Sequence, residues 1–197
     1  MKNEEHSLRT KHALAHALQT KMKKKPLSRI SVNDLVKECD INRNTFYYHF
    51  SDIYDLLNWL LKQDIDNVVK KIGLLTNTEE AIRFIMQYIE NNQHIINCTH
   101  QSFGMEAIEA FIKKGYTDAV HNSIETKAQE LNLNINSDFL DFLGNFYTEA
   151  LCGLTIYWIK NCESINKETA IQNILFMYHT ALPATLIQAE KKQTESL

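Results

Sequence analysis

The chain has 197 residues, of which 44% are hydrophobic and 23% charged, and its formal net charge is −3. This composition is typical of a globular protein and excludes a fibrous or wholly disordered chain. No uncharged apolar run approaches the roughly 18 residues of a transmembrane helix, so a membrane-spanning protein is excluded as well.

The turn-forming residues are scarce, with five glycines and two prolines in the whole chain. Folds rich in strands need frequent turns, so this scarcity predicts an all-α fold of long helices. The first ten residues, MKNEEHSLRT, lack the apolar segment of a signal peptide. The four cysteines show no CxxC spacing; they are Cys39, Cys98, Cys152 and Cys162. Both features predict a protein of the reducing cytoplasm.

Charge is distributed unevenly along the chain. Residues 1–52 carry ten Lys and Arg against six Asp and Glu, whereas residues 53–197 carry eleven against eighteen. A small basic part joined to a larger acidic part suggests that only the first meets a polyanion. We therefore expect a DNA-binding domain over 1–52 and a second domain over 53–197.

The sequence of residues 1–52 predicts three helices in succession. A helix over 7–24 ends before Pro26, which cannot continue it. Ser31 is a helix cap, and Asp34 three residues later completes a capping box. After a tight connection at Asp40, Asn42 caps the third helix. Two helices joined by so short a turn form a helix-turn-helix.

The third helix has an unusual outer face. Phe46 and Phe50, at i,i+4 spacing, supply its buried side and leave polar and aromatic residues outside. In the major groove an arginine pairs with guanine, an asparagine with adenine, and a tyrosine ring contacts a thymine methyl. Hydroxyl and imidazole groups suit phosphate oxygens. An aromatic core helix, or one covered by a partner, is the alternative, and for His49 a packing or surface role is an equal one.

The sequence from about residue 78 onward predicts long amphipathic helices only. One begins at Thr78 as its cap, one runs over 103–131 with a kink near Gly115, and the last two cover about 137–161 and 167–190. These last two are apolar on more than one face, so each buries one face in its own domain and another against a neighbour. A larger monomer core is the alternative. Pro183 is expected to kink the final helix.

The stretch ISVNDLVKECDINRNTFYYHFSDIYDLL resembles the DNA-binding head of the TetR family of transcriptional regulators. Ser31 matches the family's first cap, residues 39–42 its turn, and 45–50 its Thr-(Leu/Phe)-Tyr-x-(His/Tyr)-Phe signature. The resemblance covers about 7–60 and is closest to the branch that includes regulators of dihydroxyacetone kinase operons. It implies a dimeric all-helical protein, with a helix-turn-helix head and a larger domain for effector binding and dimerisation.

The resemblance also implies roles for individual positions. Base contacts fall to Asn33, Arg43, Asn44 and Tyr47, and phosphate contacts to Ser31, Thr45, Tyr48 and His49. Lys25, in the lysine cluster 23–25, adds a further candidate phosphate contact, with a solvated helix end as the alternative. A four-helix dimer interface is assigned to Phe139, Phe142, Leu154, Tyr157, Ile174, Tyr178 and Leu182.

Two positions depart from the family pattern. Asp40 stands where a glycine is usual, and aspartate can adopt the left-handed conformation at some cost. Ile53 stands where the fourth helix usually begins with a lysine that meets phosphate. This position offers no salt bridge to DNA, so the dipole of the helix N-terminus must suffice there.

The second domain gives weaker indications. Candidate ligand-binding residues are Phe84, Tyr88, Phe103, Met105, Phe111, Tyr116, Tyr147 and Trp158, with His121, Asn145 and Thr148 as polar groups; a core role is the alternative for each aromatic residue. No cofactor is expected. His94, Cys98 and His100 are zinc-ligand types, which His121 or Cys152 would complete, but their spacing matches no tight zinc signature.

The leading hypothesis is a dimeric DNA-binding regulator that binds a palindromic operator and is switched by a small molecule. An enzyme is not expected, since no GxSxG, P-loop, Rossmann fingerprint or HExxH occurs. The alternatives are a metal-responsive regulator, or a helix-turn-helix protein that acts mainly through a co-regulator protein. The loss of lysine at Ile53 favours the co-regulator hypothesis.

Overall fold

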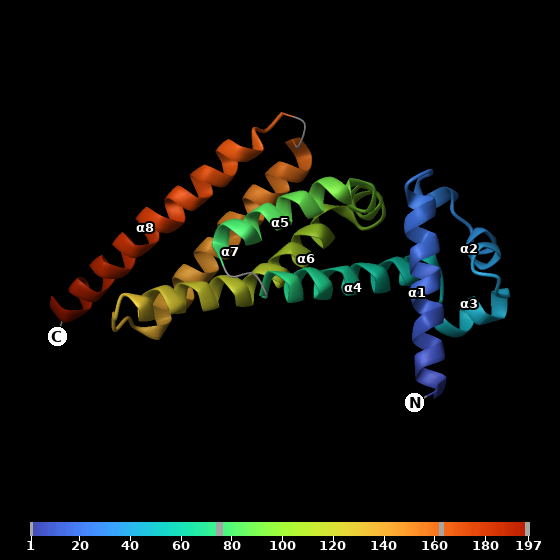
Figure 1. Cartoon of the computed structure of the whole chain (residues 1–197), viewed down its shortest axis with the longest axis horizontal. Helices are drawn as coiled ribbons and strands as arrows, with labels where there is room; N and C mark the ends of the chain where they lie inside the picture. Colours follow the sequence, from blue (N-terminus) through green and yellow to red (C-terminus); the bar gives the residue numbers. More distant parts are fainter. Residues whose placement is uncertain (1, 74–76, 162–163, 196–197) are drawn as a thin grey trace. The chain divides into compact units, whose positions relative to one another are not determined.

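The protein is described here from a computed structural model that covers residues 2–73, 77–161 and 164–195. In these ranges the elements are helices and turns, with no strand, so the all-α prediction is confirmed (Figure 1). Cys162 lies outside the described residues. No helix within them is both long and apolar enough to cross a bilayer.

The chain divides into two compact units. The head unit comprises Met1–Asn67 and Asn92–Ile108, and the body unit comprises Val68–Asn91 and Glu109–Leu197. The sequence predicts a boundary at residue 52 between a DNA-binding domain and an effector domain. These functional domains differ from the two compact units, and the boundary stays a prediction.

The head unit begins with α1 (Lys2–Met22), a 3-10 turn (Leu27–Arg29), α2 (Val32–Glu38) and α3 (Arg43–His49). The long α4 (Ile53–Gly73) starts in this unit. Its core consists of side chains with no exposed surface, namely Leu14, Leu18, Leu35, Phe46, Leu56 and Leu57. α2 packs against both α1 and α3, which fixes the helix-turn-helix on its supporting helix (Figure 1).

The turns of the head unit follow from local chemistry. The Ser31 hydroxyl accepts from the Asp34 backbone N–H, and the Asp34 carboxylate accepts from the Ser31 N–H, which confirms the capping box. The Asn42 side chain caps α3 by accepting from the Thr45 N–H at 2.8 Å. Asp40 has a φ of 52°, so it adopts the left-handed conformation that the turn requires.

The body unit holds α5 (Thr78–Asn91), the second part of α6 (Gln93–Glu130), α7 (Ser137–Asn161) and α8 (Lys167–Glu195). Asn77, not Thr78, caps α5, because its side chain accepts from the Glu80 N–H at 2.8 Å. One core cluster joins α6, α7 and α8 through Ile124, Ala128, Leu143, Leu182 and Leu186. A second joins α5 and α8 through Ile82, Met86, Ile171 and Leu175.

The break in α6 differs from the predicted one. Gly104, with φ 81° and ψ 174°, interrupts the helical backbone, whereas Gly115 lies in a continuous helical stretch. These dihedrals belong to a region that only glycine populates readily, so the break is set by backbone conformation. Gly115 instead packs close to Val69. Pro183 lies within α8, which continues to Glu195.

Charged side chains tie α5 to α8. The Arg83 guanidinium donates to both carboxylate oxygens of Glu168 at 2.8 Å and to Glu79 at 2.7 Å. Such a two-point pair is stronger than a single ion pair. The Arg83 guanidinium, followed by the Gln172 amide, lowers the pKa of Glu168 to about 2.

This pair makes the stability of the body unit pH-dependent in a predictable direction. The carboxylate of Glu168 stabilises the fold fully above its ordinary pKa of 4.5, and the contribution disappears as the pH falls from there towards about 2. We expect Glu168→Gln to lower the thermal unfolding midpoint at pH 7 and to match the unaltered protein near pH 2. Thermal unfolding followed by circular dichroism measures this, with exposed Glu125→Gln as control. A difference that stays constant from pH 7 to pH 3 would contradict it.

Candidate nucleic-acid interface

The α3 helix separates its residues into an inner and an outer face. Phe46 and Phe50 are buried at 0% and 3% exposure, and their rings pack 6.0 Å apart. Arg43, Asn44, Tyr47 and Tyr48 are all exposed. Tyrosine rings exposed next to an arginine and an asparagine provide groups that read base edges and groups that bind phosphate.

Two of the predicted base-contact residues are joined to each other. The Arg43 guanidinium donates to the Tyr47 hydroxyl at 3.1 Å and lies 5.8 Å from the centre of its ring. Because the tyrosine oxygen accepts this bond, its own O–H stays available to another acceptor. The contact holds the long arginine side chain along α3, which lowers the conformational entropy lost when the guanidinium pairs with a base. Asn33, the predicted base contact on α2, is exposed.

The predicted phosphate contacts are partly engaged inside the protein. The Lys25 ammonium pairs with the Asp34 carboxylate at 2.9 Å, and the Ser31 hydroxyl donates to that same carboxylate. The Thr45 hydroxyl donates to the Asn42 side chain. Tyr48, by contrast, is 80% exposed. Phosphate must therefore compete with Asp34 for Lys25, while Tyr48 can donate without breaking a contact.

His49 is half-buried at the end of α3. Its Nδ1 lies 3.5 Å from the Ser7 hydroxyl. Partial burial, followed by the nearby Lys11 and His6 charges, lowers the pKa of His49 below 6.5. The imidazole is thus uncharged at neutral pH, and it can offer phosphate an N–H bond but no positive charge.

The N-terminus of α4, where Ile53 replaces the usual lysine of the family, carries two acidic residues. Asp52 caps the helix by accepting from the Asp55 N–H at 2.8 Å, and the Asp55 carboxylate accepts from Ser51 at 3.0 Å. The two carboxylates beside Ile53 offset the partial positive charge of the helix N-terminus. They therefore weaken its attraction for an anion such as phosphate.

Replacing Ile53 with lysine is expected to strengthen DNA binding without changing sequence preference. One added phosphate contact should steepen the dependence of log affinity on log salt by about 0.9. Fluorescence polarisation of labelled duplex DNA at several salt concentrations measures this slope, with Ile53→Met as the control of similar size. An unchanged slope would show that this helix end does not approach the backbone.

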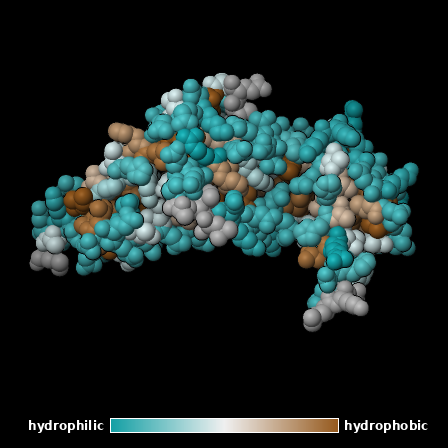
Figure 2. All heavy atoms as spheres, in the orientation of Figure 1, coloured by the Kyte–Doolittle hydropathy of each residue, from teal (hydrophilic) through white to brown (hydrophobic). Residues whose placement is uncertain are grey.

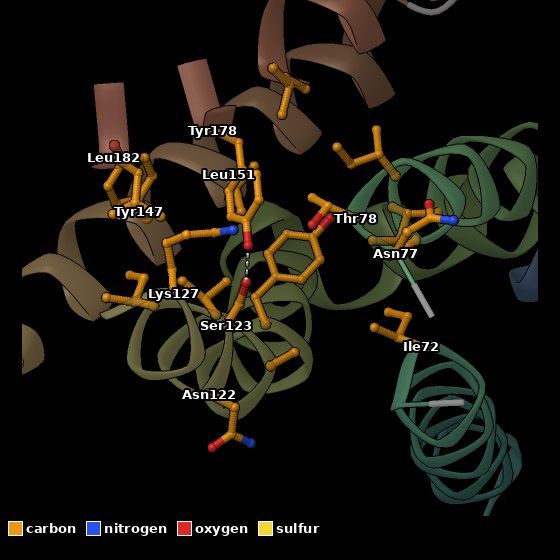
Figure 3. Close-up of a pocket in the computed structure, with 18 of the residues that line it drawn as sticks. Ile72, Asn77, Thr78, Asn122, Ser123, Lys127, Tyr147, Leu151, Tyr178 and Leu182 are labelled. Carbon is orange, nitrogen blue, oxygen red and sulfur yellow. Dashed lines mark hydrogen bonds between the residues drawn. The ribbon is translucent and has the colours of Figure 1, made fainter. Parts of the chain in front are cut away.

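In the body unit, a cavity of about 580 Å³ opens between α5, α6, α7 and α8, with Ile72 at the end of α4 also in its lining (Figure 3). Of the ligand-binding residues that the sequence predicts, Tyr116, Tyr147 and Trp158 line this cavity. The others lie elsewhere: the Phe84 and Tyr88 rings contact each other, Phe103 contacts Tyr54 in the head unit, and Phe111 is absent from the lining.

His121 also lies outside the cavity lining. Its ring occupies the space where a side chain at Gly144 would sit, and its Nε2 is buried with no hydrogen-bond partner among the described residues. Its Nδ1 is 3.8 Å from the Asp141 carboxylate. His121 therefore serves the packing of α6 against α7, where only glycine leaves enough room.

The residues assigned to a dimer interface fall into two groups. Phe142 and Tyr157 are exposed, whereas Leu182 has no exposed surface and Ile174 and Tyr178 line the cavity. Leu154 is exposed and also lines the cavity. Phe139 is partly buried and stacks on Phe142. Further exposed apolar residues that the sequence did not single out are Phe176, Met177 and Ile187. Along α8 in the view of Figure 2, hydrophobic residues reach the surface.

The zinc hypothesis finds no geometric support. No three His, Cys, Asp or Glu side chains among the described residues are placed to share a metal ion. Cys98 is buried in the head unit, and the Nε2 of His94 is buried there with no hydrogen-bond partner in the described ranges.

Comparison with known families accounts for both parts of the chain. Residues 21–60 match the family described as bacterial regulatory proteins, tetR family. Residues 76–180, more than half of the chain, match the TetR-type family described as transcriptional regulator C-terminal region. The chain belongs to the TetR family.

Individual TetR-type relatives agree with this assignment. The dhaKLM operon transcriptional activator DhaS of Lactococcus lactis is 25% identical over 91 residues, which cover 46% of this chain and 49% of DhaS. The aligned segment thus spans about half the length of that relative. The predicted resemblance to regulators of dihydroxyacetone kinase operons is confirmed.

Two solved TetR-type structures share the fold. The dihydroxyacetone kinase operon activator DhaS superposes with a TM-score of 0.69 at 19% identity, covering 92% of this chain and 98% of that one. NalD of Pseudomonas aeruginosa, the secondary repressor of the MexAB-OprM multidrug efflux pump, superposes with a TM-score of 0.53 at 14% identity, covering 86% and 94%. As a TetR protein, this chain is a DNA-binding transcriptional regulator and not an enzyme.

Proposed function

We propose that this TetR-type regulator acts in the cytoplasm as a homodimer that binds a palindromic operator through α3 of each subunit. On this proposal, residues 1–52 form the DNA-binding domain, and residues 53–197 provide dimerisation and a small-molecule effector site. The observation that carries it is the outer face of α3, where Arg43, Asn44, Tyr47 and Tyr48 are exposed over a core of buried Phe46. The half-site centres should then lie about 34–36 Å apart, or a multiple of this.

Base reading is assigned to Arg43, Asn44 and Tyr47 on α3 and to Asn33 on α2. A guanidinium that is already held by Tyr47 is well placed for a two-point contact with guanine. Phosphate binding is assigned to Ser31, Thr45, Tyr48, His49 and Lys25, whose polar atoms lie on and before the same two helices.

These two roles predict different mutant behaviour. Arg43→Ala should lose about 1–3 kcal/mol of discrimination at one base pair, whereas Thr45→Ala should weaken all sequences alike. Binding to the preferred duplex and to single-base variants of it measures both. Equal loss at every sequence from Arg43→Ala would contradict its role in base reading.

Dimerisation is proposed through the exposed apolar stripes of α7 and α8. Phe142, Phe146 and Tyr157 recur on one side of α7, opposite its buried Thr148 and Thr155. Gly153 lies in the same stripe, with nothing within 4 Å of the position of a side chain there. An exposed glycine in an apolar stripe permits close approach of a second helix, and a second copy of this chain offers the matching surface. Leu182, which is fully buried, is left out of this interface.

The effector site is proposed to be the cavity of the body unit. Its volume of about 580 Å³ falls within the range of small-molecule sites, and its walls are largely apolar with a few polar groups. An effector acts on the operator only through different affinities for the two conformations of the dimer.

A co-regulator protein is the second candidate partner. Asp52 and Asp55 make the α4 N-terminus acidic beside Ile53, and this favours a helix-turn-helix whose DNA contacts need support from another protein. The salt dependence of duplex binding separates the two cases, because phosphate contacts produce it and protein contacts need not.

A further inference from the structure

The walls of the body cavity come from five helices, α4 to α8, and are mostly apolar. Its largest side chains are Tyr116, Tyr147, Trp158 and Tyr178, and the rest combine isoleucine, leucine, valine and alanine with asparagine, threonine, serine, lysine and glutamate. Rings of this kind favour a ligand with an aromatic or aliphatic body. The polar groups decide which oxygen or nitrogen atoms that ligand can carry.

One hydroxyl pair in the cavity is already fully satisfied. The Thr155 hydroxyl donates to the backbone carbonyl of Leu151 at 2.8 Å, so its proton is in use. The Tyr116 hydroxyl, 2.8 Å from the Thr155 oxygen, must therefore donate its own proton to that oxygen. Burial also raises the pKa of Tyr116 to about 12, which keeps it protonated. This pair has no proton left for a ligand.

A second hydroxyl pair has one proton to spare. Ser123 and Tyr178 lie 2.8 Å apart and point toward each other in Figure 3. Two hydroxyls carry two protons, and their single mutual bond uses one. Neither group makes another hydrogen bond among the described residues, so the remaining O–H can donate to a ligand.

Lys127 lies beside this pair, one helical turn after Ser123. Its ammonium donates to Glu130 at 2.5 Å and lies 6.0 Å from the centre of the Tyr178 ring. An ammonium has three N–H groups, so two remain after the bond to Glu130. Lys127 and Glu130 are the charged residues of the described lining, and their charges cancel.

From these contacts we infer that the cavity takes an uncharged, mainly aromatic molecule with a carbonyl or similar acceptor oxygen that docks on Ser123, Lys127 and Tyr178. This inference rests on the proposed effector site. A carboxylate would compete with Glu130 or add an unbalanced negative charge to an apolar site.

Three compounds with the same pair of rings separate these possibilities: benzophenone, diphenylmethane and 4-benzoylbenzoate. Titration calorimetry on the full chain should show that benzophenone binds roughly three- to tenfold more tightly than diphenylmethane, which lacks the oxygen. The added carboxylate should weaken binding at least about tenfold relative to benzophenone. Irradiated benzophenone should cross-link to α6, α7 and α8 residues of the cavity, located by mass spectrometry.

Variants test the donor assignment. Ser123→Ala or Tyr178→Phe alone leaves one free hydroxyl, so the preference for benzophenone should persist, and the double variant should reduce it. Tyr116→Phe is the matched control and should leave the preference unchanged, because its proton is already committed to Thr155. The inference would be overturned if diphenylmethane bound as tightly as benzophenone or if 4-benzoylbenzoate bound more tightly than benzophenone. It would also be overturned if none of the three compounds bound.

The readout on DNA distinguishes this inference from the proposed switch. If benzophenone binds in the cavity and leaves operator affinity unchanged, the ligand class stands and the effector role fails. If operator affinity responds to a compound of another class that cross-links in the same cavity, the effector role stands and the inferred ligand class fails.

Discussion

Phe142→Asp combined with Phe146→Asp is expected to convert the protein into a monomer and to reduce operator affinity at least ~100-fold. The two rings are 59% and 58% exposed and stack with their centres 6.4 Å apart. Burying a phenylalanine side chain contributes about 1.5–3 kcal/mol, and a two-fold interface buries each ring twice. Placing charge there should raise the dimer dissociation constant by roughly three orders of magnitude or more.

A matched control separates the interface from the change in charge. Lys114→Asp, at an exposed position on α6, shifts the net charge by the same two units and should leave the dimer intact. Because both phenylalanines are exposed, the double variant should retain its helical circular dichroism. Sedimentation equilibrium gives the subunit stoichiometry and fluorescence polarisation the operator affinity. A double variant that stays dimeric would rule out this face as the interface.

Phe46→Ala is expected to give the largest loss of stability in the head unit, about 3–5 kcal/mol. Its side chain has no exposed surface, and its ring lies 5.5 Å from that of Tyr47 and 6.0 Å from that of Phe50. Whole domains are stable by only about 5–15 kcal/mol, so the loss should open α3 and remove DNA binding, although Phe46 itself offers DNA no contact.

The adjacent Tyr48→Ala provides the comparison. At 80% exposure it should change stability by less than about 0.5 kcal/mol, while it weakens binding to all DNA sequences alike. Hydrogen exchange of backbone amides over 27–50 reports the opening directly. Protection of α3 that is equal in the two variants would contradict the role given to Phe46.

The head could be predicted from sequence because its determinants are local. The caps at Ser31 and Asn42 act within three residues, and the left-handed Asp40 follows from the short connection between two helices. The inner face of α3 follows from i,i+4 spacing alone. Local chemistry of this kind is read from a single stretch of chain.

The cavity could not be predicted in the same way. Ser123, Lys127 and Tyr178 come from two helices, and only tertiary packing brings them together. Helical periodicity shows that α7 and α8 are apolar on two faces, but it does not tell which face meets the subunit's own core. For this reason the sequence places Tyr178 and Leu182 at an interface and does not single out Phe176, which is exposed.

The kink in α6 shows a related limit. Gly104 and Gly115 are both glycines within long helical patterns, and sequence spacing does not distinguish them. The backbone dihedrals place the break at Gly104, whereas Gly115 lies in continuous helix beside Val69. The deciding information is the backbone conformation at Gly104, which glycine adopts readily.

Selection of random duplex DNA on the purified protein, at two salt concentrations, tests the central claim most directly. We predict enrichment of a palindromic sequence, with binding that weakens as salt rises and with base preference that is relaxed by Arg43→Ala. Failure to bind duplex DNA at either salt concentration would contradict operator binding through α3 and would favour action through a protein partner.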